Sequence, residues 1–400
     1  MKLIERPLYL NRLKNLQGTP DIKIITGIRR CGKSKLMLSF MNEIKRNELD
    51  SNIIYIDFTR LEFEELKEYH SLNDYIIKHT RKECHNYLMI DEVQMCPNFE
   101  ITINSLHSSE IYDIYLTGSN AFLLSADLAT LFTGRHIEIH VFPFSFAEYC
   151  RYFEITEDYE KAFDRYVVEG GLSGSYVYPE RTDREAYIRE VYDTILTRDL
   201  TEKYRLGDTQ TLSHLAEYMM DNVSNVTSPN NIANILSANQ IPSSHVTIGK
   251  YLKYLCNAFL FYKTERYDIK GKKYLESLNK YYLADTGIRY ALLGLRNMDW
   301  GHVYENIVYL ELLRRGYNVY IGKLYQKEID FVAMKSNDKL YIQVSDDISN
   351  EQTFHRETTP LLHIGDAYPK IIIARTKHMP YDYQGIHILD LASWLKDEKM

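Results

Sequence analysis

The stretch IKIITGIRRCGKS, residues 22–34, decides the fold of this chain. Residues 22–26 are mostly apolar, which is typical of a buried parallel strand. The eight residues that follow match G-x-x-x-x-G-K-[ST], the Walker A phosphate loop. Backbone N–H groups of such a loop surround a phosphate, and the next helix directs its positive N-terminal end at the same anion. We therefore predict that Lys33 reaches the β- and γ-phosphates of a nucleotide and that Ser34 ligates Mg²⁺.

A helix is expected directly after this loop, because apolar residues at 36, 37, 40, 41 and 44 recur at helical spacing. A preceding strand and a following helix are the context that separates a phosphate loop from a chance turn. The residues predicted to bind ATP are Gly27, Ile28, Arg29, Arg30, Cys31, Gly32, Lys33, Ser34 and Lys35.

The composition is that of a globular protein with two to three domains, since the chain has 400 residues, 45% of them hydrophobic and 26% charged. The net charge of −7 argues against a uniformly basic, nucleic-acid-coating surface but allows a local basic patch. The five cysteines form no C-x-x-C pair, so neither a zinc ribbon nor a disulfide framework is indicated. The sequence has no apolar signal core or membrane-length apolar run, and we expect a cytoplasmic protein without a membrane segment.

A second motif pairs an apolar strand with two acids. Residues 87–90, YLMI, form the expected strand, and Asp91 and Glu92 come directly after it. Ligands of an open α/β sheet bind at the carboxyl ends of the strands, so Asp91 should arrive where Ser34 already lies. This is the Walker B pattern. We predict that Asp91 holds Mg²⁺, directly or through water, and that Glu92 is the general base for the attacking water.

Two further catalytic candidates follow the next strands. The expected strand at 111–116 ends in Thr-Gly-Ser-Asn, where Asn120, or else Ser119, could sense the γ-phosphate; a plain turn is the alternative. Alternating apolar residues predict a fifth strand around 137–141, and Arg135 precedes it. An arginine there either stabilises transition-state charge in a neighbouring subunit, as an arginine finger, or forms a surface salt bridge.

The chain resembles a large group of bacterial and archaeal AAA+ superfamily ATPases with an uncharacterised C-terminal region. The matching segments are GIRRCGKS (27–34), YLMIDEVQ (87–94), IYLTGSNA (114–121), TGRHIEIHVFPFSFAEY (133–149) and KYYLADTGIR (280–289). One departure is visible: that group often has Gly-Gly-x-Pro after the ATPase core, where this chain has Gly-Gly-Leu-Ser at 170–173. The resemblance implies an ATPase that switches conformation with its nucleotide, and it supplies no substrate.

The middle of the chain predicts a helical lid followed by a winged helix. Residues 157–205 have helical periodicity, and within them Arg198 and Asp199 are expected to form a solvent-side ion pair rather than to touch the nucleotide. Residues 212–290 suggest three helices, with segments 259–267 and 272–285 as the wing. Segment 230–280 holds eight Lys or Arg and three acids, a net charge of +5. This segment could bind DNA or could dock a protein, because the winged-helix fold serves both.

The last region resembles the restriction-endonuclease-like nuclease fold. A helix carrying Glu305 precedes three expected strands, and Asp330 lies on the second of them. Gln343 stands where that fold has its second acid, and Ser345 where it has its lysine. Two acids can hold Mg²⁺, but the cation that would activate water is missing, so a degenerate nuclease site at Glu305, Asp330 and Gln343 is expected unless Lys327 or Lys335 replaces the lysine in space.

Together these features predict an α/β P-loop NTPase with a parallel sheet covered by helices on both faces, plus a winged helix and a nuclease-like α/β domain. The expected boundaries are 1–150 for the ATPase, 151–210 for the lid, 211–295 for the winged helix and 296–400 for the last domain. The expected function is an Mg²⁺-dependent ATPase, with Lys33, Glu92, Asn120 and Arg135 as its catalytic residues, that drives a conformational switch. The alternatives are a DNA-processing ATPase and a signalling scaffold with little turnover. Expected partners are ATP, ADP, an unidentified protein, DNA through 230–280, and further copies of the chain.

Overall fold

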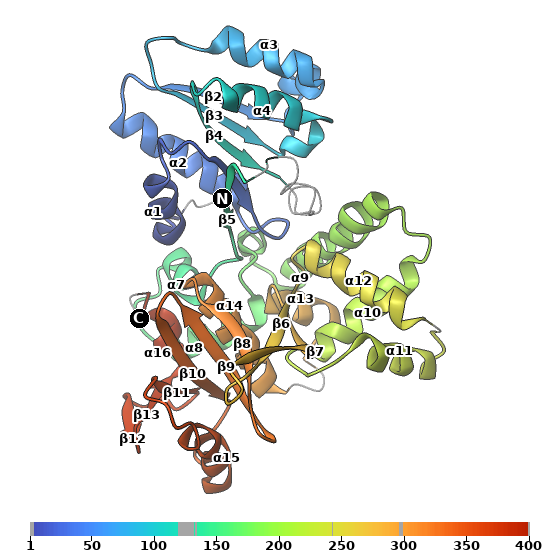
Figure 1. Ribbon diagram of the computed structural model, residues 1–400, viewed down its shortest axis with the longest axis vertical. Coiled ribbons are helices and arrows are strands. Elements are labelled where there is room, and N and C mark those ends of the chain that lie inside the picture. The colour runs from blue at the N-terminus through green and yellow to red at the C-terminus, as the bar shows by residue number, and fades with distance from the viewer. Residues whose placement is uncertain (1–3, 119–131, 133, 242, 296–298, 399–400) are drawn as a thin grey trace. The chain divides into compact units, whose positions relative to one another are not determined.

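A computed structural model of the chain describes residues 4–118, 132, 134–241, 243–295 and 299–398 (Figure 1). The chain divides into two compact units. The N-terminal unit comprises residues 1–141 together with the short segment 198–203, and the C-terminal unit comprises 142–197 and 204–400. Each unit has its own sheet.

The N-terminal unit is built on a parallel five-stranded sheet in the order β2-β3-β4-β1-β5. Its strands are short and contain many isoleucines, and the inner strands β1, β3 and β4 are almost wholly buried, as expected for a parallel sheet covered on both faces. Their bounds are β1 (Ile22–Thr26), β2 (Asn52–Asp57), β3 (Asn86–Asp91), β4 (Tyr112–Thr117) and β5 (His136–His140). The predicted parallel sheet is therefore confirmed, and all its strands end at one edge.

Helices cover both faces of this sheet, as predicted (Figure 1). On one face, apolar residues of α3 and α4 share a core with strand residues such as Ile24, Ile56 and Ile90. On the other face α2 packs against the sheet, with the rings of Phe40 and Tyr115 centred 5.1 Å apart. The helical elements are α1 (Pro7–Asn15), α2 (Lys33–Asn47), η1 (Leu61–Lys67), α3 (Tyr69–His79), η2 (Val93–Met95) and α4 (Phe99–Ser108).

The C-terminal unit begins with helices. A π-helix, η4 (Ile195–Glu202), follows α9 without interruption and supplies the segment that belongs to the N-terminal unit. The other helical elements are α7 (Phe146–Phe153), α8 (Tyr159–Glu169), η3 (Ser173–Val177), α9 (Arg181–Thr194), α10 (Thr209–Asp221), α11 (Pro229–Ala238), α12 (His245–Asn257), α13 (Thr286–Leu293), α14 (Trp300–Arg314), α15 (Glu351–Leu362) and α16 (Leu391–Lys396).

A mixed eight-stranded sheet, in the order β12-β13-β11-β10-β9-β8-β6-β7, completes this unit. Helix α15 packs on a core that includes Ile329, Tyr341 and Ile372. The strands are β6 (Phe261–Asp268), β7 (Lys273–Leu283), β8 (Asn318–Leu324), β9 (Lys327–Lys335), β10 (Asp338–Ser345), β11 (Lys370–Ala374), β12 (Tyr381–Tyr383) and β13 (Ile386–Asp390).

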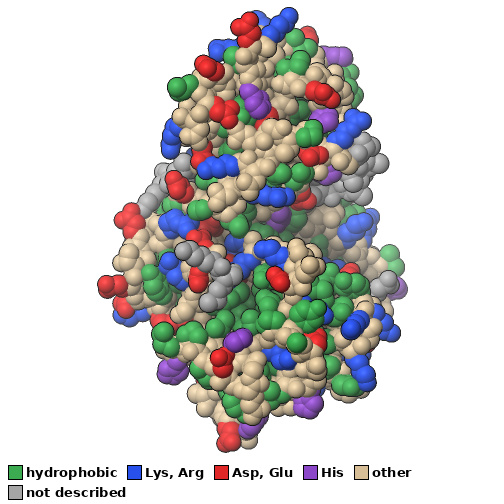
Figure 2. Space-filling view, turned by 60° about the vertical axis from the view of Figure 1, so that its left-hand side comes forward, with side chains coloured by type: hydrophobic (Ala, Val, Ile, Leu, Met, Phe, Trp, Pro, Cys, Tyr) green, Lys and Arg blue, Asp and Glu red, His purple; other side chains and the backbone are tan. Residues whose placement is uncertain are grey.

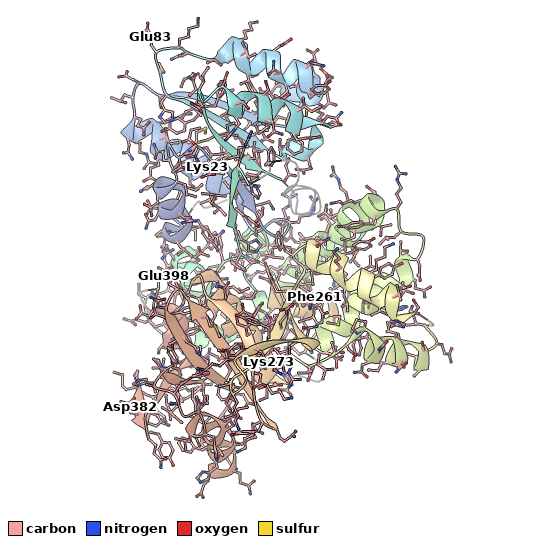
Figure 3. All side chains as sticks on the ribbon, viewed as in Figure 1. Lys23, Glu83, Phe261, Lys273, Asp382 and Glu398 are labelled. Carbon is pink, nitrogen blue, oxygen red and sulfur yellow. The ribbon has the colours of Figure 1, made fainter. Side chains whose placement is uncertain are left out.

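The segments expected to form a wing are the hairpin of β6 and β7, which turns just before Lys273 (Figure 3). Strand β6 also pairs with β8, so this hairpin shares one sheet with the strands of the expected last domain. The expected boundary at 295 falls inside that unit, and the first unit ends at Val141 rather than at 150. The four-part division and the winged-helix interpretation stay predictions.

The surface carries charges of both signs side by side on the face that Figure 2 shows, with a broad area of hydrophobic side chains among them. This mixture agrees with the small net charge and with a basic patch that is local at most. Within the described ranges, the helices are all too short or too polar to cross a membrane.

Candidate functional site

The loop between β1 and α2 has the backbone that a phosphate loop needs. Gly27 and Gly32 have φ angles of 142° and 105°, which side chains other than glycine rarely adopt. A Cβ atom at Gly27 would lie 2.1 Å from the carbonyl oxygen of Val141, so a larger residue cannot stand there. Gly32 is the N-cap of α2, and the free N–H groups of the first turn therefore begin at Lys33.

Lys33 lies over this loop with only 6% of its surface exposed. Its Nζ donates to the carbonyl oxygens of Gly27 and Ile28, at 2.9 and 3.2 Å. Among the described residues no carboxylate forms an ion pair with it. A buried ammonium group that is satisfied by neutral carbonyls alone favours an anion as its partner.

Asp91 is the last residue of β3, and two hydroxyl groups form hydrogen bonds to its carboxylate. The hydroxyl of Thr117, at the end of the neighbouring β4, donates to its carboxylate, and the hydroxyl of Ser34 also bonds to it. The backbone N–H of Glu92 donates to the same Thr117 hydroxyl, at 3.2 Å. Burial raises the pKa of Asp91, and the two hydroxyl hydrogen bonds oppose that rise. Ser34 of the Walker A motif and Asp91 of the Walker B motif therefore lie in contact, as predicted.

The oxygen atoms of Ser34 and Asp91 fit Mg²⁺, because this ion prefers oxygen ligands and uses one or two protein groups beside phosphates and water. Glu92 follows with a left-handed backbone, φ 55°, and its carboxylate accepts a hydrogen bond from the side chain of Gln94. Backbone strain of this kind gathers at functional sites. Glu92 is partly exposed, so water can reach it.

Sequence inspection missed a histidine at this edge of the sheet. His140 ends β5 opposite Thr26, and its Nδ1 lies 3.1 Å from the Thr26 hydroxyl. Burial and the nearby charge of Lys33 lower the pKa of His140 to about 3, so the imidazole is neutral. The position could be found only by knowing that β5 lies next to β1, which the sequence does not state.

The expectation of a solvent-side ion pair at Arg198 and Asp199 is wrong for Asp199. Its carboxylate is buried and binds Arg29 of the phosphate loop. The reason is the π-helix η4, which returns residues 198–203 to the N-terminal unit.

Two predicted catalytic residues are not among those that contact one another at the phosphate loop and Asp91. Asn120 and its alternative Ser119 lie outside the described residues. Arg135 precedes β5 with an exposed side chain, and within the described part of the chain it has no ion-pair partner.

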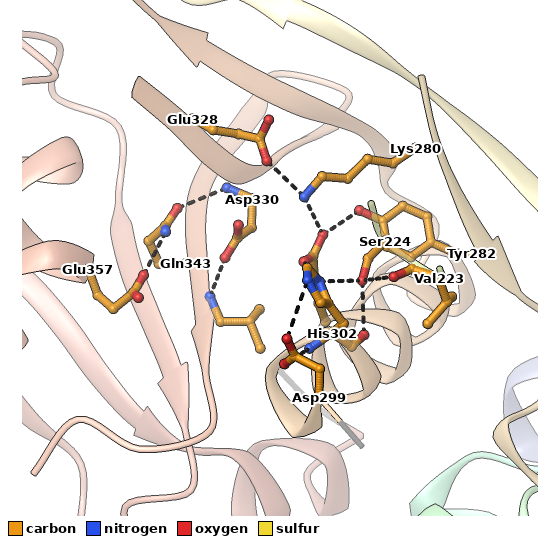
Figure 4. A network of polar contacts seen from close by, with 12 residues as sticks. Val223, Ser224, Lys280, Tyr282, Asp299, His302, Glu328, Asp330, Gln343 and Glu357 are labelled. Carbon is orange, nitrogen blue, oxygen red and sulfur yellow. Dashed lines mark hydrogen bonds and ion pairs between the residues drawn. The ribbon is translucent and has the colours of Figure 1, made fainter. Parts of the chain in front are cut away.

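The predicted C-terminal site forms a polar network between α14, β7, β9 and β10 (Figure 4). Glu305 accepts hydrogen bonds from Lys280 Nζ at 2.8 Å and from the Tyr282 hydroxyl at 2.6 Å. His302 Nδ1 lies 3.7 Å from its other carboxylate oxygen. Lys280 also contacts Glu328 at 2.8 Å. The sequence offered Lys327 or Lys335 as a replacement for the missing lysine, and Lys327 does line the cleft with Glu305 and Asp330. Lys280, which was assigned to the expected wing, also lies in this network.

Charges in this network compensate one another. Burial opposes ionisation of Glu305, but the charge of Lys280 and three hydrogen bonds outweigh it and lower its pKa. Burial also opposes the charged form of Lys280, yet the negative charges of Glu305, Asp330 and Glu328 raise its pKa. The pKa of Asp330 is raised well above the ordinary value, by burial first and then by the charge of Glu305. Lys280 therefore favours the charged form of Glu305, whereas burial and the charge of Glu305 disfavour the charged form of Asp330.

Asp330 and Gln343 are also bonded to their neighbours. Asp330 accepts a hydrogen bond from the N–H of Val344 at 2.8 Å, and the Gln343 amide bridges the N–H of Asp330 to Glu357, at 2.8 Å on each side. Ser345 donates to the carbonyl oxygen of Asp347. These groups line an open cleft of about 750 Å³. The structure brings Glu305, Asp330 and Gln343 together, but their polar atoms are largely engaged.

Comparison with known proteins finds two matching domain models and two relatives. Residues 19–150 match the model of an AAA domain, and residues 160–299 match a domain of unknown function, DUF8612. An uncharacterised protein of Haemophilus influenzae is 37% identical over 398 residues, with 98% of each chain covered. An uncharacterised protein of Methanocaldococcus jannaschii is 28% identical over 377 residues, covering 89% of this chain and 82% of that protein.

Solved structures show distant similarity. A Walker-type ATPase of Pyrococcus abyssi has a TM-score of 0.42 and 17% identity, with 72% of this chain and 95% of that chain covered. AMPPCP-bound DnaA from Aquifex aeolicus has a TM-score of 0.32 and 16% identity, covering 62% and 86%. We draw nothing about function from similarities this distant.

Proposed function

This chain belongs to the protein family of its Haemophilus influenzae relative and carries an AAA domain, and from that premise we propose that it is an Mg²⁺-dependent ATPase that acts as a conformational switch. The AAA domain supports nucleotide binding and ATPase activity. One observation carries the finer proposal: Lys33, Ser34 and Asp91 converge at the edge where all five parallel strands end.

Each residue has a physical role in the proposed hydrolysis. Lys33 exchanges two carbonyl contacts for the β- and γ-phosphates of ATP. Ser34 and Asp91 hold Mg²⁺, which neutralises phosphate charge when it is bound. Glu92 accepts a proton from the attacking water. The main chain of residues 27–35 surrounds the phosphates.

The direct test is steady-state ATPase activity with and without Mg²⁺ and with and without DNA. We expect Mg²⁺-dependent turnover, and Glu92→Gln should lower it about 10²-fold or more while ATP still binds. Glu65→Gln, at an exposed carboxylate of η1, is the matched control for the exchange of acid and amide. Near-normal turnover in Glu92→Gln would place the base elsewhere. Turnover strongly stimulated by DNA favours the DNA-processing alternative, and ATP binding without turnover favours the scaffold.

Arg135 is proposed as an arginine finger that acts on a neighbouring copy of the chain. Its exposed guanidinium, with no ion-pair partner among the described residues, supports this over the surface salt bridge. Arg135→Ala should lower turnover without weakening ATP binding. A mixture with Glu92→Gln should regain activity, because each variant supplies what the other lacks; a mixture without rescue excludes action between subunits. Asn120 remains the proposed γ-phosphate sensor.

DNA is the proposed second ligand, through the basic segment 230–280. Lys250 and Lys253 are exposed on α12, and three lysines are exposed at the β6–β7 turn, at positions 270, 272 and 273. Binding should weaken steeply with salt, since neutralised phosphates release counterions. Reversal of Lys250, Lys253 and Lys272 to glutamate should abolish binding. The same reversal at the exposed lysines 45, 78 and 82 of the N-terminal unit is the control; equal losses in both triple variants would exclude a specific patch.

The C-terminal cleft is proposed to be a degenerate nuclease site that does not cleave DNA. Lys280 restores a cation to the cluster, but it is bound to two carboxylates, and Glu305 is engaged through both of its oxygens. Little negative charge is left for Mg²⁺. A nuclease assay with Mg²⁺ and Mn²⁺ on single- and double-stranded DNA tests this. Cleavage that disappears in Asp330→Ala while ATPase activity survives would overturn it.

A further inference from the structure

The phosphate loop is joined to a segment from far along the chain by one ion pair. Arg29 Nε donates to Asp199 Oδ2 at 2.9 Å, and Arg29 Nη2 donates to Asp199 Oδ1 at 2.5 Å. Two parallel hydrogen bonds of this kind fix both the position and the plane of the guanidinium. The side chains are 21% and 9% exposed, so this pair is shielded from the solvent that weakens surface salt bridges.

Arg29 also lies close to the proposed general base. It is the second residue after Gly27, on the loop that surrounds the phosphates. The hydrogen bonding of Arg29 to Asp199 is the main cause that raises the pKa of Arg29, and the negative charge of Glu92 adds to it. The guanidinium thus has Asp199 on one side and Glu92 within electrostatic reach. A cation beside the proposed base stands where negative charge develops during phosphoryl transfer.

Asp199 occupies an unusual backbone element. Residues 195–202 form a π-helix, a rare structure that is found most often at functional sites. Of its residues, 198–202 belong to the N-terminal unit, whereas 195–197 and the chain from 204 onward belong to the C-terminal unit. A rearrangement of this short helix therefore moves Asp199 and is passed to the loop through Arg29.

We propose that Arg29 contacts the γ-phosphate of ATP in its own subunit, and that Asp199 is the positioning residue that directs it there and links turnover to the π-helix. This inference rests on the proposed ATPase function. In the step itself, a water oxygen bonds to the γ-phosphorus, the bond from that phosphorus to the oxygen it shares with the β-phosphate breaks, and Glu92 takes the water proton. Arg29 transfers nothing; it stabilises charge on the γ-phosphate oxygens.

Coupling follows from the same contact. If the γ-phosphate attracts Arg29, the hold of Arg29 on Asp199 changes with the nucleotide, and the π-helix responds. Linkage requires the reverse as well: a change in the π-helix alters how Arg29 meets the nucleotide. The π-helix η4 is then a two-state element whose conformation depends both on the nucleotide and on the residues that flank η4.

The test measures kcat, KM and ATP affinity on the full chain for Asp199→Asn, Arg29→Gln and the double variant. Asp199→Asn should lower kcat about tenfold or more and leave ATP affinity within about threefold, because only alignment is lost. The double variant should be no slower than Arg29→Gln alone, because both changes remove one function. Asp193→Asn, at an exposed carboxylate of α9 six residues before Asp199, is the matched control and should keep full kcat.

If the Arg29–Asp199 pair were purely structural, the variants would keep their kcat or the losses in the double variant would be additive. Asp199→Glu keeps the charge, and partial recovery of kcat at unchanged melting temperature supports positioning. If Asp199→Asn fails to fold, Arg29→Lys replaces it, since it keeps the charge and loses the fork; its kcat should fall while its ATP affinity stays. Unchanged kcat in either variant, or additive losses in the double variant, overturns the inference. If the wild-type chain neither binds nor hydrolyses ATP, it is the proposed function that fails.

Discussion

Two of the buried lysines, Lys33 in the N-terminal unit and Lys280 in the C-terminal unit, show how similar side chains have different roles. Lys33 is satisfied by two neutral carbonyl oxygens of its own loop, and no described carboxylate pairs with it. Lys280 lies 2.8 Å from each of two carboxylates, those of Glu305 and Glu328. Both lysines are less than 7% exposed.

The difference lies in where the compensating charge comes from. In the C-terminal network the chain itself supplies the compensating charge, so removal of either partner leaves a buried charge without compensation. At the phosphate loop the chain supplies only dipoles, so an external anion is the natural counter-charge. A buried lysine thus has a structural role in the C-terminal network and indicates ligand binding at the phosphate loop.

The largest expected effect is on stability, in Lys280→Met. Removal of the ammonium leaves Glu305 buried without a counter-charge, and breaking such a pair costs roughly 3–5 kcal/mol. Urea unfolding measures it. Lys33→Met is the matched variant and should cost only about 1 kcal/mol, since it loses hydrogen bonds to neutral carbonyls. Equal costs for the two lysines would erase the distinction drawn between them.

A smaller loss is expected for Tyr282→Phe. The tyrosine hydroxyl donates to Glu305 at 2.6 Å, and a hydrogen bond to a charged group contributes about 1.5–3 kcal/mol. Lys280 still balances the carboxylate in this variant, so the loss should be less than in Lys280→Met. Urea unfolding again provides the measurement, and a cost equal to that of Lys280→Met would mean that the hydroxyl, rather than the charge, holds the network together.

Close to neutral pH, the smallest expected effect is a pH dependence at the phosphate loop. The pKa of His140 is about 3 in the folded chain and 6.5 in its ordinary state, so the folded state binds fewer protons between these values. Its contribution to stability is complete above pH 6.5 and is lost as the pH falls, by at most about 1.4 kcal/mol per pH unit. His140→Gln should flatten the acid limb of stability against pH, and the exposed His378→Gln should not. An unchanged limb in His140→Gln would contradict the low pKa.

Local sequence was enough for the parts of the site that are contiguous. The phosphate loop requires glycine backbone, one lysine and one hydroxyl within eight residues, all of which are visible in the sequence. An apolar strand followed by Asp91 and Glu92 places these acids at the carboxyl ends of the parallel strands, where the phosphate loop also lies. The parallel sheet with helices on both faces follows from the same pattern, whereas the order of its strands does not.

Partners that are distant in sequence could not be predicted. Arg29 and Asp199 are 170 residues apart, and no periodicity signals a π-helix that returns to the loop. Lys280 was assigned to a wing because its strand follows three helices, and its pairing with Glu305 depends on which strand lies beside α14. His140 likewise depends on the neighbour of β1. Such contacts are set by tertiary packing, which a single sequence does not encode locally.

The most direct test of the account is the ATP affinity of the wild-type chain, Lys33→Met and Lys280→Met, measured under one set of conditions by calorimetry with Mg²⁺. Lys33→Met should lose about 100-fold or more, because two charge-assisted contacts to phosphate disappear. Lys280→Met, assayed at a temperature where it is folded, should stay within about threefold of the wild type. An affinity of Lys33→Met within twofold of the wild type would contradict the assignment of this loop as the ATP site.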